Sequence, residues 1–125
     1  MPTLTIPISD TEWLTANGRY HWADKAKRTK ALRSKTAILA RQRLQPITGP
    51  VHITAFIAYP RGGRVDVHNA MPSVKPCIDG LVDAGIFVDD STKYLLGPDM
   101  RVDIPTKTKG LHEVRLEITR QNHEF

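Results

Sequence analysis

Four segments of the chain have the hydrophobic and polar pattern of β-strands. They are residues 3–8, 51–59, 93–102 and 111–120. In the first segment Leu4, Ile6 and Ile8 alternate with smaller or polar residues, which is the period of a half-buried strand. The second segment (VHITAFIAY) is rich in β-branched and aromatic residues, a composition that favours a core strand.

Two further segments predict helices. Residues 24–44 contain neither Gly nor Pro and are rich in Ala, Lys, Arg, Leu and Gln, so they form the longest predicted helix, with Asp24 as a candidate N-cap. A second helix is predicted over about residues 73–84, with Pro72 and Pro76 in or before its first turn. Its buried stripe consists of Val74, Ile78 and Leu81, which fall at helical spacing.

The order of these elements, β-α-β-α-β-β, predicts a single α+β domain over residues 1–125. We expect a mixed β-sheet, two main helices and a final hairpin closed by the basic turn at residues 105–110. A chain of 125 residues has the size of one domain with one core. The N-terminus lacks a signal-like apolar stretch and no segment is long enough to cross a bilayer. We therefore expect a soluble, unprocessed, cytoplasmic protein with no membrane partner.

The charge of the chain makes a polyanion a plausible partner. The net charge is +5, and the segment 24–44 carries eight Lys and Arg residues with Asp24 as its only acid. A solvated helix face normally mixes signs. The candidate DNA-binding residues of this helix and of two loops are Lys27, Arg28, Arg61, Arg64, Lys107 and Lys109. Contacts of this kind hold phosphates without reading bases, which suits recognition of DNA shape.

Three aromatic residues and the single cysteine have mainly structural interpretations. Trp13, Tyr20 and Trp22 lie near the first helix and have two open uses: stacking on an unpaired base, or core packing, which we expect for at least two of them. Cys77 is the only cysteine, which excludes an intramolecular disulfide framework and a multi-cysteine zinc site. Its place beside the apolar stripe predicts a buried, unreactive thiol.

Acidic residues gather in the middle of the chain. They are Asp66, Asp79, Asp83, Asp89 and Asp90. On a helix, Lys75, Asp79 and Asp83 succeed one another by one turn. Clustered carboxylates repel one another, and a divalent ion such as Mg²⁺ or Mn²⁺ relieves this repulsion and can activate water for phosphodiester cleavage. On spacing alone the alternative stays open that these are turn and surface aspartates.

A family resemblance gives this pattern a specific interpretation. The run at 61–69 (RGGRVDVHN), followed by Lys75 and by residues 79–90 (DGLVDAGIFVDD), resembles the signature of RusA-type Holliday junction resolvases. That family has a basic loop leading to Asp-x-Asp-Asn, a Lys on the next helix, an Asp-Ala-Leu element, a Gly and a closing Asp-Asp. The similarity covers the central third of the chain. Outside it, Asn17 and the basic turn before the last strand are similar in kind.

The resemblance implies roles for individual residues. The catalytic residues would be Asp66, Lys75 and Asp90, the metal ligands Asp66, Asp90, Asp89 and His68, and the supporting residues Asn69 and Asp79. The departure from the family pattern is His68, which stands where the family has its second aspartate. It is interpreted either as a nitrogen ligand that favours Mn²⁺ over Mg²⁺ or as a polar loop residue.

The resemblance also implies the reaction and the assembly. We expect a divalent-metal-dependent endodeoxyribonuclease that resolves four-way junctions or similar branched DNA in recombination and repair. A homodimer would supply the two symmetric cuts. Two alternatives stay open: a related nuclease acting on flaps, and a non-catalytic branched-DNA-binding module with a decayed active site.

Overall fold

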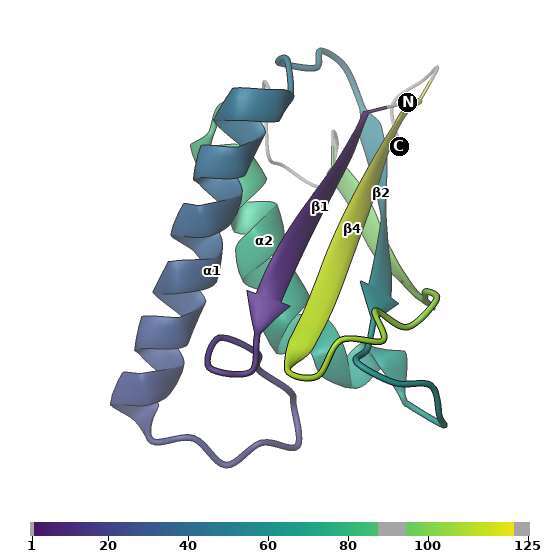
Figure 1. Cartoon of the computed structure of the whole chain (residues 1–125). Coiled ribbons are helices and arrows are strands. Elements are labelled where there is room, and N and C mark those ends of the chain that lie inside the picture. The colour runs from purple at the N-terminus through teal and green to yellow at the C-terminus, as the bar shows by residue number, and fades with distance from the viewer. Residues whose placement is uncertain (1, 88–94, 122–125) are drawn as a thin grey trace.

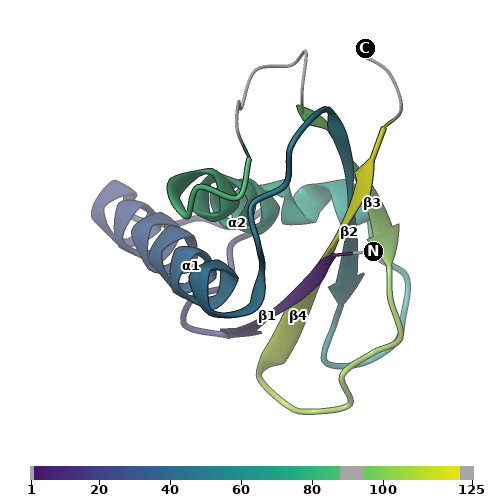
Figure 2. The ribbon, with the colours of Figure 1, turned by 90° about the horizontal axis from the view of Figure 1, so that it is seen from above.

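A computed structural model of the chain describes residues 2–87 and 95–121 as a four-stranded sheet with two helices packed on one face (Figure 1; Figure 2). The elements are β1 (Thr3–Ser9), α1 (Trp22–Arg43), β2 (Val51–Ala58), the short 3-10 helix η1 (Val67–Ala70), α2 (Met71–Asp83), β3 (Leu95–Val102) and β4 (Leu111–Arg120). The predicted α+β class with a mixed sheet and two main helices is confirmed.

The sheet has the strand order β1-β4-β2-β3, and this order contradicts the predicted final hairpin. The last strand, β4, lies antiparallel between β1 and β2, whereas β3 pairs in parallel with the far side of β2. Residues 103–110 therefore cross the end of β2, where the N–H groups of Asp103 and Thr106 donate to the carbonyls of Ile57 and Tyr59, each at 2.8 Å. The regular burial of alternate residues suits β4 to a central place, and the exposed β3 suits an edge.

The helix boundaries differ from the predicted ones for local reasons. Helix α1 begins before Asp24, because the Nδ1 atom of His21 accepts a hydrogen bond from the N–H of Ala23 and so caps the helix. Helix α2 begins earlier than expected because η1 leads directly into it. Pro72 lies in its first turn as predicted, but Pro76 lies inside the helix. Over the described part of the chain, neither helix combines the length and apolar character of a membrane span.

The core lies between the sheet and the two helices. The predicted inward residues of β1 and the predicted stripe of α2 are all buried: Leu4, Ile6, Ile8, Val74, Ile78 and Leu81. The helices approach each other closely at Gly80, where a Cβ atom would lie 2.6 Å from the carbonyl oxygen of Arg33 and 2.8 Å from the Cβ of Thr36. The absence of a side chain at this position therefore sets the distance between α1 and α2.

We predict that Gly80→Ala destabilises the protein. Alanine usually stabilises a helix interior relative to glycine by about 1 kcal/mol. Here the methyl group meets the α1 backbone, and overpacking of this kind typically costs about 1–3 kcal/mol. The unfolding free energy, measured in urea, should fall. A matched control is Gly62→Ala, whose Cβ would meet only the Pro105 side chain at 3.7 Å. Equal or greater stability of Gly80→Ala would contradict the close packing.

Candidate nucleic-acid interface and acidic pocket

Three loops meet at the end of the sheet where β1 and β2 finish and β4 begins (Figure 1). The antiparallel register explains the meeting, since Ser9 pairs with Leu111 and Ala58 with Glu113. The loops at 10–21, 59–66 and 103–110 therefore leave the sheet side by side. Residues that are far apart in the sequence come together at this end.

The loops line an open cavity of about 640 Å³, called here the basic cavity. Its lining residues are Asp10, Tyr59, Pro60, Arg61, Gly62, Gly63, Arg64, Val65, Lys107, Lys109 and Gly110. Four predicted DNA-binding residues, from two loops about 45 positions apart in the printed sequence, thus share one cavity. Among the residues that the structure describes, none of these four cations forms an ion pair.

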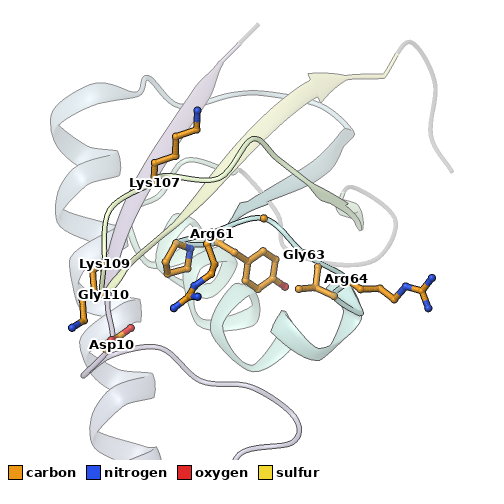
Figure 3. A pocket seen from close by; sticks show the side chains of 11 residues that line it. Asp10, Arg61, Gly63, Arg64, Lys107, Lys109 and Gly110 are labelled. Atoms are coloured by element: carbon orange, nitrogen blue, oxygen red, sulfur yellow. The ribbon is translucent and has the colours of Figure 1, made fainter.

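The shape of the basic cavity follows from its backbone. In Figure 3 Arg61 points into the middle of the view, Arg64 extends to one side, and Asp10 lies beside Gly110 at the other. The N–H of Asp10 donates to the carbonyl of Gly110 at 3.1 Å, which joins the first loop to the last. Lys107 adopts a left-handed backbone conformation (φ 59°) that costs a residue with a side chain about 1 kcal/mol. The turn at Lys107 therefore has a specific backbone conformation and carries a cation.

A smaller cavity of about 310 Å³, the acidic pocket, adjoins the basic cavity. Its lining residues are Thr15, Asn17, Tyr59, Arg64, Val65, Asp66, Asn69 and Ala70. Asp66 caps η1 by accepting a hydrogen bond from the N–H of His68 at 3.1 Å, and its side chain is still 64% exposed. Burial, and then the charge of Asp66, raise the pKa of the Tyr59 phenol. The pocket brings together Asp66 and Asn69 with Asn17, the residue noted from the loop after the first strand.

The remaining described residues of the predicted site lie in a neighbouring groove. His68, Lys75 and Asp79 line a groove of about 420 Å³ together with residues of α1. The Nζ atom of Lys75 is 2.6 Å from Oδ1 of Asp79, so the lysine is held by an ion pair within α2. The structure therefore places Lys75 in a different cavity from Asp66. His68 adjoins both, with its Nδ1 atom 3.5 Å from Oδ1 of Asp66.

The described residues provide part of a divalent-metal site. No group of three His, Cys, Asp or Glu side chains is close enough to hold an ion anywhere in residues 2–87 and 95–121. The acidic pocket offers the Asp66 carboxylate and the amide oxygens of Asn17 and Asn69, a set of hard oxygen donors that suits Mg²⁺ or Mn²⁺. The other two predicted carboxylate ligands, Asp89 and Asp90, lie outside the described residues.

Arg28, a predicted DNA contact, has an internal role. Its guanidinium donates to the carboxylate of Asp24 at 2.9 Å and to the backbone carbonyls of Asp10 and Trp13 at 3.1 and 3.0 Å. It also lies over the Tyr20 ring, 5.3 Å from the ring centroid. Arg28 thus fastens the first loop to α1. Lys27, the other predicted contact on this helix, is exposed.

Acids from other elements balance part of the charge of α1. Arg33 forms a two-point ion pair with Asp83 of α2, which raises the pKa of the guanidinium and lowers that of the carboxyl. Lys35 pairs with Glu12 at 2.6 Å. Burial would raise the pKa of Glu12, but hydrogen bonds from Lys35 and Ser9 leave it lowered. The helix therefore offers fewer unpaired cations than its own sequence indicates, because the acids that pair with Arg33 and Lys35 come from distant parts of the chain.

An aromatic cluster under the basic cavity was not predicted. The rings of Trp13 and His112 stack with their centroids 4.0 Å apart, and Tyr59 meets both edge-on. The Nδ1 atom of His112 is buried with no hydrogen-bond partner among the described residues. Burial lowers the pKa of His112, although Asp10 opposes the shift. A sequence signal existed, since His112 is in phase with the apolar residues of β4.

The structural interpretations of the first-helix aromatics and of the cysteine are confirmed. Trp13 is buried and Tyr20 packs against the core, whereas Trp22 is 77% exposed. Cys77 is fully buried, and this burial raises the pKa of its thiol to about 11. A thiol with that pKa is an unreactive core group at neutral pH.

Two buried hydrogen bonds fix the loop that carries Asn17. The hydroxyl of Ser73 accepts from the N–H of Leu14 at 2.8 Å and donates to the carbonyl of the same residue at 2.7 Å. The N–H of Ala16 donates to the carbonyl of Asn69 at 2.8 Å. The first loop is thereby attached to the start of α2 and to η1, and the acidic pocket depends on this attachment.

No protein-family model matches the sequence, and no curated protein is similar to it at a significant level.

We predict that Ser73→Ala destabilises the fold by at least about 2 kcal/mol. The substitution leaves a buried N–H and C=O of Leu14 without their partner, and each such loss costs about 1–3 kcal/mol. Urea unfolding would measure the change. The control is Ser34→Ala on the exposed face of α1, which should leave stability unchanged or slightly raised. If both variants are equally stable, the Ser73 hydroxyl does not hold the loop.

Proposed function

We propose that this chain is a divalent-metal-dependent, structure-selective endodeoxyribonuclease of the RusA type, which cuts four-way junctions or similar branched DNA. One observation carries the proposal: the basic cavity and the acidic pocket share a wall formed by Tyr59, Arg64 and Val65. A DNA backbone held by the cations of the basic cavity would bring a phosphate beside Asp66 in the acidic pocket.

The basic cavity supports binding through phosphates. Each cation that neutralises a phosphate releases condensed counterions, and this release supplies affinity without reading bases. Arg61 and Arg64 present planar guanidinium groups that suit two-point contacts to phosphate oxygens, and Lys107 and Lys109 add point charges. A cavity lined by three loops also suits a bent or branched backbone better than a flat surface does.

The acidic pocket supports the hydrolytic step. A bound Mg²⁺ or Mn²⁺ would supply a water of lowered pKa and charge stabilisation for the leaving oxygen. Asp66, Asn17 and Asn69 of the acidic pocket would hold the ion. Asp89 and Asp90 are proposed as its further ligands. His68, close to Asp66, is proposed as a nitrogen ligand that favours Mn²⁺. Lys75 would leave its ion pair with Asp79 and bind the scissile phosphate instead.

The proposal includes an assembly and a location. Two symmetric cuts in a four-way junction require two active sites related by a two-fold axis, which a homodimer supplies. A buried reduced thiol at Cys77 suits the reducing cytoplasm.

A second candidate function is a branched-DNA-binding module without catalysis. The observation that favours it is His68 in the position of the family's second aspartate, which leaves Asp66 as the one carboxylate lining the acidic pocket among its described residues. This candidate requires only the basic cavity.

We predict that Asp66→Asn lowers the rate of junction cleavage by about a hundredfold or more while leaving junction affinity within about twofold, as expected for loss of one charge-stabilising group. Asparagine caps a helix about as well as aspartate, so η1 should persist. Cleavage of a labelled four-way junction in Mg²⁺ and in Mn²⁺ measures the rate, and a mobility-shift titration measures the affinity.

The matched control is Asp99→Asn, an exposed aspartate on β3 that contacts His52 and lines neither cavity. It should cut like the wild type. Parallel loss of binding and cutting in Asp66→Asn would make Asp66 a structural residue. Wild-type protein that binds the junction but never cuts it in either metal would favour the non-catalytic module, and cutting confined to flaps would favour the related nuclease.

We also predict a steep salt dependence of junction binding that originates in the basic cavity. Arg64→Gln and Lys107→Gln should each make the slope of log affinity against log salt shallower by about one unit. Arg120→Gln removes the same charge at the opposite end of β4 and should leave the slope unchanged. Equal slopes for all three variants would place the phosphate contacts elsewhere.

A further inference from the structure

Trp22 is the most exposed large apolar side chain in the described part of the protein. Its exposed fraction is 77%, whereas Trp13, the other tryptophan of the chain, is 8% exposed. Tryptophan is normally buried to a large extent because of its apolar area. Trp22 is the first residue of α1, so the ring is presented to solvent by regular structure.

A shallow, open depression of about 490 Å³, formed entirely by side chains of α1, extends along the helix from this ring. Its lining residues are Trp22, Lys25, Ala26, Thr29, Lys30 and Arg33, and we call it the Trp22 groove. Ala26 and Thr29 are short side chains one and two helical turns beyond Trp22, so they leave space next to the indole. Lys25 and Lys30 form no ion pair within the described residues, whereas Arg33 is held by Asp83.

The Trp22 groove is continuous with the groove of the proposed site. Lys25 and Thr29 line both the Trp22 groove and the groove that contains His68 and Lys75. His68 in turn lies beside Asp66. A polyanion can therefore follow one surface from the exposed indole to the acidic pocket.

The start of α1, which carries the indole, is tied to the residues before it. The Nδ1 atom of His21 caps the helix, and the His21 ring lies 5.6 Å from the Trp22 ring, tilted by 32°. The preceding loop is fastened to α1 by Arg28. A tryptophan side chain has two rotatable bonds, so its ordering costs comparatively little conformational entropy when a ligand stacks on it.

We propose that the Trp22 groove binds an unpaired nucleotide segment of DNA, with a base stacked on the Trp22 indole and the phosphates neutralised by Lys25 and Lys30. This inference rests on the proposed function and adds a substrate feature to it: a single-stranded stretch or an opened base near the branch. Stacking on an aromatic ring accepts any base, and flanking lysines complement the backbone. A protein or lipid partner that uses only the apolar ring would leave these two lysines without a counter-charge.

The test is binding of fluorescently labelled oligothymidylate, followed by anisotropy, with no metal added. Trp22→Ala should weaken binding about tenfold, which corresponds to the loss of one stacked base, and Trp22→Phe should recover most of that loss. Bound oligothymidylate should also quench the emission of exposed Trp22 in the wild type, and this quenching should be absent in Trp22→Ala. The control is Ile38→Ala, another exposed apolar residue of the same helix outside the groove.

The outcomes separate this inference from the nuclease proposal. Equal binding by wild type and Trp22→Ala overturns the stacking site, even if both proteins cut junctions. Loss of oligothymidylate binding in Trp22→Ala supports the site, even if the wild type never cuts DNA. If Trp22→Ala instead changes only the sedimentation of the protein or its binding to anionic vesicles, the groove is a contact between copies or with lipid, and the inference is wrong.

Discussion

The two buried hydrogen bonds between Ser73 and Leu14 hold together the parts of the candidate site. One partner belongs to the loop after β1 and the other to the first turn of α2, so the bonds join segments 59 positions apart in the chain. The carbonyl of Asn69 adds a further bond to the same loop at Ala16. Because a buried peptide group without a partner is costly, the loop has one favourable position on α2. That position places Asn17 in the acidic pocket with Asp66.

The sequence predicts those features that depend on local periodicity. The burial of alternate residues in β1, the apolar stripe of α2 and the confinement of Cys77 all follow from spacing along one element. Strand order does not follow from local spacing, because the neighbours of β4 depend on which strands can be buried at the centre of the sheet. The central strand can bury a residue at every second position, and the exposed β3 is limited to one partner.

The candidate site was predicted in part for the same reason. The grouping of Asp66 with Asn69 is local in sequence, and the convergence of Arg61 with Lys107 needs only that two loops leave the same end of the sheet. The internal role of Arg28 and the pairing of Arg33 with Asp83 depend on tertiary contacts that no periodicity encodes. Nor does spacing along α2 reveal that η1 separates Lys75 from the acidic pocket.

Residues 103–110, which cross the end of β2, have two roles. They connect the edge strand to the central strand, and they deliver Lys107 and Lys109 to the basic cavity. A hairpin turn tolerates added residues because its strands stay paired, whereas this segment must span a fixed width of sheet and end in a fixed turn. Its length should therefore be among the least variable features of any homologues of this chain, and insertions should gather in other loops.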